Sequence, residues 1–213
     1  MKKSAIILAG GFSNRFGQDK GLLKLADQPL IVHVLEKVST VVDEILVVVS
    51  SESQKKAYTH WEPRAKIVMD KYKMQSPLVG ALTGFESVRG EYSLLLPCDT
   101  PFVSRQIASL LLESCVGKDA VIPRWPNSYM EPLQAAYNTE SGLTAASKAL
   151  EDRKLNMNSM ITYLKEIQYV STLVLKQIDP RLITFFNVNT PRDLRKAENI
   201  LQDLSVVNQK LGA

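Results

Sequence analysis

The chain has 213 residues, of which 45% are apolar and 23% are charged. This composition excludes wholesale disorder and is typical of a globular protein, so we expect a single domain over residues 1–213. The net charge is +4, and residues 1–24 account for all of it with five basic residues and one acidic residue. Because the remainder of the chain is electrically balanced, a polymeric nucleic acid is not an expected partner.

No apolar run approaches the roughly 18 residues that a membrane span requires. The apolar stretch Ala5 to Ala9 is too short for a secretory signal and ends in two glycines, so we expect a cytoplasmic protein with no membrane partner. Cys98 and Cys115 cannot form a disulfide framework, and they lack the spacing of zinc ligands. Chemistry at oxygen ligands, basic side chains and backbone amides is therefore favoured over a Cys or His centre.

In the first half of the chain, short apolar runs rich in β-branched residues alternate with longer helical patterns. The runs predict strands at Ala5–Leu8, Ile45–Val49, Lys66–Met69, Tyr92–Leu96 and Ala120–Ile122. The helical patterns lie at Pro29–Val38, Ser53–His60, Leu78–Val88 and Ser104–Ser114.

The second half is less regular. It predicts strands at Pro132–Tyr137 and Tyr169–Leu175 and helices at Thr139–Leu150 and Asn156–Tyr163. Thr190 is typical of an N-cap with Pro191 in the first helical position, which predicts a last helix to about Leu204.

Strands without polar alternation indicate burial on both faces, as in a parallel sheet. The pattern therefore predicts an α/β fold of the Rossmann-like type, with a mostly parallel sheet covered by helices on both faces. Ligands of such sheets bind beyond the carboxyl ends of the strands. The residues that follow each strand are thus the candidates for function.

The first strand is followed by a loop with three glycines, Arg15 and Lys20, which runs from Gly10 to Lys20. Glycines let backbone amides approach an anion, Arg15 offers a bidentate fork, and Lys20 adds a compact positive charge. The loop matches neither the Walker pattern nor the dinucleotide fingerprint. It favours a polyphosphate site, and the alternative is a solvated strand-to-helix turn.

Two aspartates end other strands. Asp99 follows the fourth strand, where a carboxylate is suited to hold Mg²⁺ together with substrate phosphates; the alternative is a cap of the next turn. Asp70 follows the third strand and is suited to a ribose hydroxyl, a base edge or the metal, or is a plain loop residue. Asn187 and Asn189 flank Val188, so alternation places both amides on the same side of an extended segment, unless they serve as turn residues.

Taken in order, these segments resemble the molybdenum cofactor guanylyltransferase family. The resemblance covers residues 5–195 and is carried by several short motifs. They are Leu8-Ala9-Gly10-Gly11 with Arg15, Gly17, Asp19 and Lys20, then Asp70, Pro77-Leu78-x-Gly80, Leu96-Pro97-Cys98-Asp99-Thr100-Pro101, Glu131-Pro132-Leu133 and Asn187-Val188-Asn189-Thr190-Pro191.

The resemblance implies a nucleotidyltransferase fold and a Mg²⁺-dependent transfer of GMP from GTP to the molybdopterin cofactor, with release of pyrophosphate. It implies that Leu8, Ala9, Gly10 and Gly11 contact the nucleotide and that Lys20 lies at its phosphates. Asp70 would then help to recognise guanosine, Asp99 would hold Mg²⁺, and Asn187 and Asn189 would lie near the metal and the acceptor. Other molybdenum cofactor proteins are the partners that this resemblance suggests.

The chemistry needs no side-chain nucleophile, because the acceptor phosphate itself attacks the α-phosphate. Lys20, Arg15 and Asp99 with its metal are then the catalytic candidates, since they offset the repulsion between two anions.

The sequence departs from the family pattern at Ser50-Ser51-Glu52, where an Asn that helps to read guanine is usual, at Ser76 in place of Gly, and at Phe16 in place of Met. A related transferase that uses CTP, or GTP with another acceptor, is the alternative enzyme. A non-catalytic nucleotide-binding module is the alternative of another class.

Overall fold

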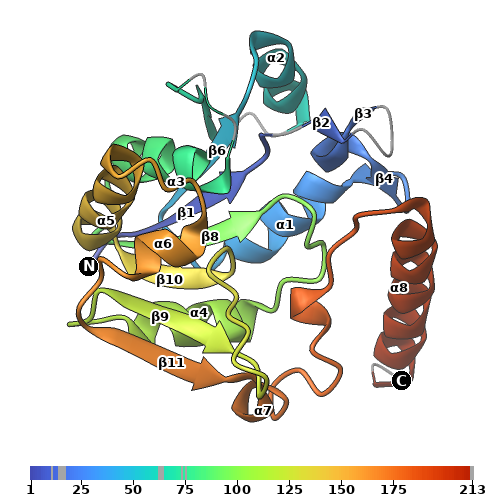
Figure 1. The fold of residues 1–213 in the computed structure, drawn as a ribbon. Coiled ribbons are helices and arrows are strands. Elements are labelled where there is room, and N and C mark those ends of the chain that lie inside the picture. Colours follow the sequence, from blue (N-terminus) through green and yellow to red (C-terminus); the bar gives the residue numbers. More distant parts are fainter. Residues whose placement is uncertain (11, 14–17, 62–64, 73, 75, 212–213) are drawn as a thin grey trace.

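A computed structural model of the protein describes residues 1–10, 12–13, 18–61, 65–72, 74 and 76–211. Its centre is a seven-stranded sheet in the order β11-β9-β10-β8-β1-β6-β7 (Figure 1). Neighbouring strands are parallel except β10, which runs antiparallel to both β8 and β9. The strands are β1 (Lys3–Leu8), β6 (Glu44–Val49), β7 (Lys66–Met69), β8 (Tyr92–Pro97), β9 (Ala120–Arg124), β10 (Ala135–Asn138) and β11 (Ile167–Ser171). The expected α/β class with a mostly parallel sheet is confirmed.

Helices cover both faces of the sheet (Figure 1). One face packs against α1 (Leu30–Val38), α2 (Glu52–Trp61) and α4 (Arg105–Ser114). The other face packs against α3 (Pro77–Ser87), α5 (Thr139–Glu151) and α6 (Met157–Ile161). The remaining elements are the short strands β2 (Phe12–Ser13), β3 (Gln18–Asp19), β4 (Lys24–Leu25) and β5 (Gln28–Pro29), the 3₁₀ turns η1 (Lys20–Leu22) and η2 (Ile183–Phe185), and the helices α7 (Thr172–Leu175) and α8 (Pro191–Leu211).

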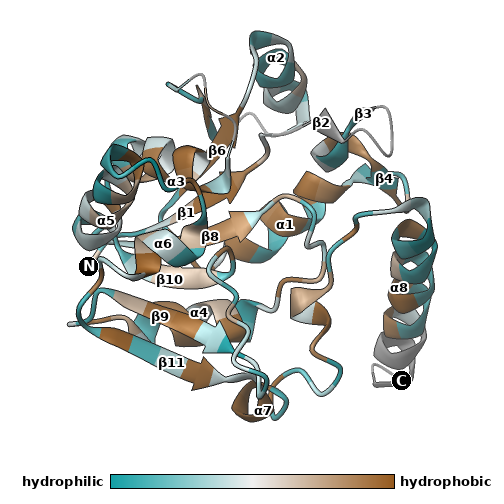
Figure 2. Cartoon of the chain, in the orientation of Figure 1, coloured by the Kyte–Doolittle hydropathy of each residue, from teal (hydrophilic) through white to brown (hydrophobic). Residues whose placement is uncertain are grey.

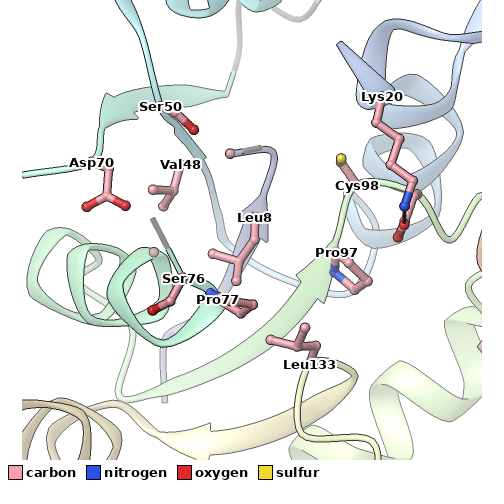
Figure 3. A pocket seen from close by; sticks show the side chains of 13 residues that line it. Leu8, Lys20, Val48, Ser50, Asp70, Ser76, Pro77, Pro97, Cys98 and Leu133 are labelled. Carbon is pink, nitrogen blue, oxygen red and sulfur yellow. Dashed lines mark hydrogen bonds and ion pairs between the residues drawn. The ribbon is translucent and has the colours of Figure 1, made fainter. Parts of the chain in front are cut away.

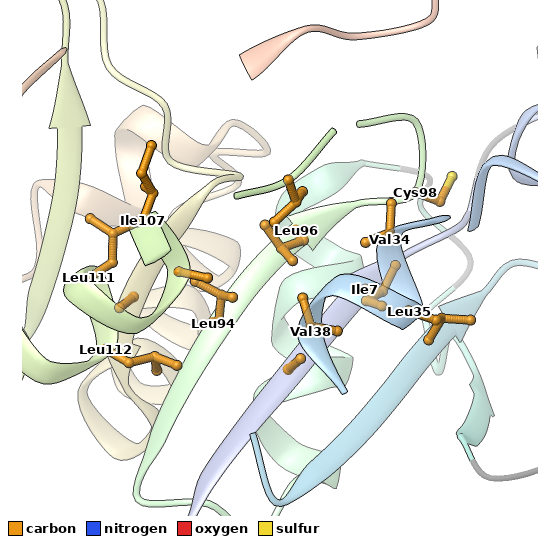
Figure 4. Close-up of a cluster of buried hydrophobic side chains, with 14 of the residues drawn as sticks. Ile7, Val34, Leu35, Val38, Leu94, Leu96, Cys98, Ile107, Leu111 and Leu112 are labelled. Atoms are coloured by element: carbon orange, nitrogen blue, oxygen red, sulfur yellow. The ribbon is translucent and has the colours of Figure 1, made fainter. Parts of the chain in front are cut away.

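The central strands are apolar on both sides because each side faces a layer of helices. In β1, Ala5 and Ile7 belong to the core under α1 and α4, whereas Ile6 belongs to the core under α3 and α5. Figure 4 shows Ile7 beside side chains of α1, with Leu94 and Leu96 of β8 lying between this group and the side chains of α4, and Figure 2 shows the apolar colouring along the central strands. This two-sided burial is the physical reason why the strands carry no polar alternation.

A third apolar cluster joins α8 to the segment that contains β4 and β5. Leu23, Leu25 and Leu30 pack there against Val188 and against the apolar side of α8, which includes Ala197. Thr190 accepts a hydrogen bond from the Asp193 amide (3.2 Å), so the expected N-cap is confirmed. The helix continues to Leu211, beyond the expected end at about Leu204.

The expectation of one strand over Tyr169–Leu175 is wrong. The strand β11 begins at Ile167 and ends at Ser171, and the residues after it form α7. The Ser171 hydroxyl accepts a hydrogen bond from the Leu173 amide (3.2 Å), which is an N-cap interaction and starts the helix. The β-branched composition of the run concealed this cap.

The sheet register brings four strand ends to one edge. Leu8 pairs with both Val48 of β6 and Pro97 of β8, and Val48 pairs with Val68 of β7. The residues that follow β1, β6, β7 and β8 therefore lie close together, although they are far apart in the sequence. In the described part of the chain, no helix combines the length and apolar character that spanning a bilayer requires.

Asp119 is expected to stabilise the fold, because its carboxylate joins β9, α5 and the start of β11. It accepts hydrogen bonds from the Ser141 hydroxyl (2.6 Å) and from the amides of Lys165 (2.7 Å) and Glu166 (3.0 Å). Burial opposes its charged form, but these hydrogen bonds outweigh burial and lower the pKa of Asp119 below its usual 3.8. Asp119→Asn should lower the free energy of unfolding by about 1–3 kcal/mol in urea denaturation at neutral pH.

The pH dependence of this effect has a definite sign. Because the pKa is depressed in the folded state, the stabilisation is present above the unfolded-state pKa and is lost as the pH falls through the folded-state pKa. The difference between the wild type and Asp119→Asn should therefore shrink in acid. If the difference in the free energy of unfolding between the two proteins stays constant as the pH falls through the folded-state pKa of Asp119, the carboxylate is not the source of this stabilisation.

Candidate active site

The aligned strand ends form the floor of a cavity of about 370 Å³ (Figure 3). Its walls come from the loops after β1, β6, β7 and β8, from the first turns of α3 and from the loop before β10. The lining residues are Leu8, Gly10, Lys20, Val48, Ser50, Asp70, Ser76, Pro77, Gly80, Pro97, Cys98, Asp99 and Leu133. The cavity is therefore placed where ligands of open α/β sheets bind.

The backbone after β1 is held close to its neighbours. The Leu8 carbonyl accepts a hydrogen bond from the Cys98 amide (3.1 Å), and the Ala9 amide donates to Val48 (2.9 Å). A Cβ atom on Gly10 would lie 2.7 Å from the Ser50 hydroxyl oxygen, so only glycine fits there without rearrangement. Of the expected nucleotide contacts, Leu8 and Gly10 line the cavity, and Ala9 is buried beside them. The expected contacts Gly11 and Arg15 lie outside the described residues.

Lys20 and Asp99 form an ion pair at one end of the cavity. The Lys20 Nζ contacts Asp99 Oδ2 and also Asn189 Oδ1. The side chains of Lys20 and Asp99 are only 20% and 10% exposed, so little water screens the pair. The two residues are 79 positions apart in the sequence, and the fold brings their charges into direct contact.

The surroundings of the second carboxylate oxygen of Asp99 indicate whether a cation can bind at this end of the cavity. Asp99 Oδ1 is buried and has no hydrogen-bond partner among the described residues, so this carboxylate retains an unused lone-pair direction. The side-chain carbonyl oxygen of Asn189 contacts the Lys20 ammonium group, as Asp99 does. Carboxylate oxygens such as those of Asp99 and amide oxygens such as that of Asn189 are ligands that Mg²⁺ prefers. In the described part of the chain no three acidic, His or Cys residues gather around a common point. A metal held by Asp99 would therefore need phosphate and water oxygens for its remaining ligands.

The two asparagines have different surroundings. The Val188 amide donates to the Asp99 carbonyl (2.9 Å), which docks this segment on the Asp99 loop. The side-chain oxygen of Asn189 accepts a hydrogen bond from Lys20. The side-chain amide of Asn187 instead donates to the Phe185 carbonyl (3.0 Å). The structure thus brings Asn189 to the charged end of the cavity and gives Asn187 a contact within its own segment.

Asp70 lies at the opposite end of the cavity from Lys20 (Figure 3). Its amide donates to the Val49 carbonyl (2.7 Å), which continues the pairing of β6 with β7. One carboxylate oxygen accepts hydrogen bonds from the Thr83 hydroxyl (2.8 Å) and the Tyr72 amide (3.2 Å). These bonds hold the carboxylate in a fixed direction and leave acceptor capacity for a hydroxyl or an amine of a ligand.

The amino end of α3 lies between the two ends of the cavity. The Ser76 hydroxyl accepts a hydrogen bond from the Val79 amide (3.2 Å) and caps the helix, and Pro77 occupies the first turn. Ser76, Pro77 and Gly80 line the cavity. Since the amino end of a helix carries partial positive charge, this wall favours an anionic ligand.

The comparisons with known proteins agree with this geometry. The family described as the MobA-like NTP transferase domain matches residues 5–167. A probable molybdenum cofactor guanylyltransferase of Methanosarcina mazei is 33% identical, over 90% of this chain and 88% of that protein. The chain belongs to the molybdenum cofactor guanylyltransferase family. A second relative with the same description, from Natranaerobius thermophilus, is 35% identical over 93% of this chain and 96% of its own length.

A solved structure supports the same assignment of family. Molybdopterin-guanine dinucleotide biosynthesis protein A of Archaeoglobus fulgidus superposes with a TM-score of 0.81 at 27% identity. The superposition covers 94% of this chain and 99% of that chain. The central sheet and the helices of this guanylyltransferase family member are therefore arranged as in its relative.

Near the site of this guanylyltransferase family member, Gln54 and Tyr58 could not be recognised from the sequence, and Ser50 stood out only as a departure from the family pattern. Ser50, at the departure from the family pattern, lines the cavity in the neighbourhood of Gly10. Gln54 and Tyr58 hydrogen-bond to Asp19, the residue before Lys20. The one signal for this pair was their spacing of four on a helix, which places them on the same face. That spacing alone does not reveal what the face contacts.

Both cysteines should react slowly with alkylating reagents. Burial raises the pKa of Cys98, with the nearby Asp99 charge adding to the effect, and burial raises the pKa of Cys115 to about 12. At pH 8 both thiols are therefore protonated, and iodoacetamide should modify them much more slowly than a free cysteine peptide, as followed by mass spectrometry. Rapid alkylation of Cys98 in the folded protein would contradict its burial and would reopen the possibility of a thiolate nucleophile.

Proposed function

We propose that the protein transfers GMP from GTP to the terminal phosphate of the molybdopterin cofactor and releases pyrophosphate. The observation that carries this proposal is the polarity of the cavity. A fixed carboxylate, Asp70, lies at one end, and the Lys20–Asp99 pair with Asn189 lies at the other. Such a cavity suits a ligand with a hydrogen-bonding base and ribose at one end and a polyphosphate at the other.

The charged end of the cavity supports the chemistry of nucleotidyl transfer. A phosphate oxygen of the acceptor forms a bond to the α-phosphorus of GTP, and the bond from that phosphorus to the bridging oxygen of the β-phosphate breaks. Lys20 can exchange Asp99 for phosphate oxygens, because its side chain is flexible and its ammonium lies at the cavity wall. There it would stabilise charge that moves toward the departing pyrophosphate.

Asp99 is the residue that would hold Mg²⁺, and Asn189 contacts the same Lys20 ammonium group as Asp99. When bound, Mg²⁺ would neutralise phosphate charge and act as a Lewis acid. Asp99 is suited to this role because one of its oxygens is buried without a partner among the described residues and the other faces Lys20. Asn187 and Asn189 are proposed to lie on the acceptor side, with Asn189 the closer of the two to the phosphates.

The base end of the cavity is proposed to read guanosine. Asp70 would accept hydrogen bonds from guanine or ribose, in a direction set by Thr83 and Tyr72. The backbone from Leu8 to Gly11 would pass beneath the ribose and the phosphates, with Arg15 as a further phosphate ligand. We also propose that other proteins of the molybdenum cofactor pathway supply the acceptor or receive the product.

Substitution of Lys20 tests its phosphate role. Lys20→Ala should remove about 2–4 kcal/mol of transition-state stabilisation. In an assay of pyrophosphate release, kcat/KM for GTP should therefore fall roughly 30- to 1,000-fold. The matched control is Lys24→Ala, since Lys24 is an exposed lysine of the same segment. Turnover by Lys20→Ala equal to that of the control would remove Lys20 from the mechanism.

Substitution of Asp99 tests the metal site with two readouts. Asp99→Asn should reduce pyrophosphate release and should also weaken the binding of Mn²⁺, used as a paramagnetic substitute for Mg²⁺, in electron paramagnetic resonance titrations with GTP present. The physical reason is that the amide lacks the negative charge that attracts the ion. Unchanged Mn²⁺ affinity and unchanged turnover together would show that the metal is held elsewhere.

A nucleotide panel tests the base assignment, which matters because Ser50-Ser51-Glu52 departs from the family pattern. In thermal-shift measurements with Mg²⁺, GTP should raise the melting temperature more than ATP, CTP or UTP. At a concentration 100-fold above Kd, binding adds about 2.7 kcal/mol to the free energy of unfolding, so the shift is measurable. Equal or greater stabilisation by CTP would overturn the guanine assignment and favour a cytidylyltransferase.

A further inference from the structure

The carboxylate of Asp19 is enclosed by hydrogen-bond donors from two elements. Asp19 Oδ1 accepts from the Tyr58 hydroxyl (2.6 Å) and from the Gly21 amide (3.0 Å). Asp19 Oδ2 accepts from the Gln54 side-chain amide (2.6 Å). Tyr58 and Gln54 belong to α2, and Gly21 belongs to η1, so this one carboxylate fastens the turn to the helix.

Gln54 connects this carboxylate to the floor of the cavity. Its carbonyl oxygen accepts from the Ser50 amide (2.8 Å) at the end of β6, and its nitrogen also points to the Ala9 carbonyl (3.4 Å) after β1. A glutamine is suited to this place because it offers an acceptor to Ser50 and a donor to Asp19 at the same time. The side chain thus holds two strand ends and the turn in a fixed relation.

Tyr58 closes the other side of the network. Burial raises the pKa of the Tyr58 phenol, and the nearby Cys98 and Asp19 raise it further, so the hydroxyl stays protonated and donates. Tyr58 is 2% exposed and packs tightly, since a Cβ atom on Gly21 would lie 2.2 Å from its hydroxyl oxygen. The phenol reaches Asp19 only because residue 21 has no side chain.

The hydrogen bonds of this network are made by the residues on either side of Lys20, Asp19 and Gly21. Asp19 is the N-cap of η1, and Lys20 is the first residue of that turn. Neither Asp19, Gln54 nor Tyr58 lines the cavity between Asp70 and Lys20; Asp19 and Gln54 line a separate hollow, which meets that cavity at Ser50. A displacement of about 1 Å of a catalytic group can cost roughly 100-fold in rate, so the position of this turn matters to a lysine that acts on phosphates.

We propose that Asp19, Gln54 and Tyr58 are positioning residues that hold the η1 turn in the place from which Lys20 reaches the phosphates. This inference rests on the proposed role of Lys20 in nucleotidyl transfer. It assigns to α2 the function of a rigid support, which connects the ends of β1 and β6 to the turn that carries the lysine.

A reversal of one hydrogen bond tests the network. Asp19→Asn places an amide nitrogen against the nitrogen of Gln54, and Gln54→Glu places two carboxylates against each other. The double variant Asp19→Asn with Gln54→Glu restores a donor opposite an acceptor, with the polarity reversed, and retains an acceptor for Ser50, Gly21 and Tyr58, while the longer contact with the Ala9 carbonyl (3.4 Å) is lost. Gln106→Glu, on an exposed glutamine in the first turn of α4, controls for the added negative charge.

Each single variant should lower kcat about 10- to 100-fold, with a much smaller change in KM for GTP, and the double variant should recover most of the loss. Melting temperatures of all variants show which of them fold. Tyr58→Phe removes one hydroxyl and keeps the ring, so it provides a milder variant, with a smaller drop in kcat, should a single variant fail to fold. The proposal is overturned by wild-type kcat in the folded single variants. It is also overturned when the double variant folds but recovers no activity while Tyr58→Phe is as active as the wild type.

A readout that needs no turnover separates this inference from the proposed function. In protein labelled with carbon-13 at the lysine ε position, the Lys20 resonance, identified by its loss in Lys20→Ala, should shift in the single variants and return in the double variant. If the wild type fails to transfer GMP but this pattern holds, the network stands and the proposed function falls. If the wild type transfers GMP and the Lys20 resonance is the same in every variant, the network falls and the function stands.

Discussion

The contact between Lys20 and Asp99 is the interaction on which the site depends. It joins residues 79 positions apart, and Asn189, which shares the same ammonium, is 169 positions from Lys20. Removing charges from water is costly unless they are paired, so the partly buried aspartate favours a fold in which the lysine turn lies against it. The hydrogen bond from Val188 to the Asp99 backbone then holds the third segment in place. Three distant parts of the chain thus meet at one end of one cavity.

The opposite end of the cavity carries a carboxylate instead of an ion pair. This difference means that the two ends of a ligand are recognised by different groups. Asp70 is held by Thr83 and Tyr72 and carries no basic partner among the contacts described for it. Between the two ends lies the amino end of α3, which favours an anion. Cys98, although it lines the cavity, is a protonated thiol because burial raises its pKa. The chemistry that this arrangement favours is stabilisation of phosphate charge rather than covalent catalysis.

The residues that shape the site extend beyond the cavity wall. The hydrogen bonds of Gln54 and Tyr58 to Asp19 show that α2 supports the lysine turn from behind. Ser50 has a double connection to this region, since its amide donates to Gln54 and its side chain lies against Gly10. A change at the end of β6 therefore bears on the position of the lysine turn as well as on the ligand, which gives the departure at Ser50-Ser51-Glu52 a structural meaning.

Local pattern predicted the elements well because strand and helix periodicity depend on neighbouring residues. The strands of the parallel sheet were predicted to within a few residues, and Gly10, Lys20, Asp70 and Asp99 line the cavity as their placement after strands suggested. Local pattern failed where the same amino-acid composition is compatible with both a strand and a helix. The β-branched run after Ile167 was assigned to a single strand, although a serine N-cap divides it into a strand and a short helix.

The sequence by itself determined the fold class, the sheet edge that carries the site and the kinds of groups found there. Only the tertiary structure decided which of these groups meet. The order of the strands and the packing of α2 bring Lys20 to Asp99, Asn189 to Lys20 and Gln54 to Asp19, and they place Asp70 across the cavity. The physical reason is that hydrophobic periodicity is a local property of the chain, whereas contacts between residues 35 to 169 positions apart depend on how the whole sheet is assembled.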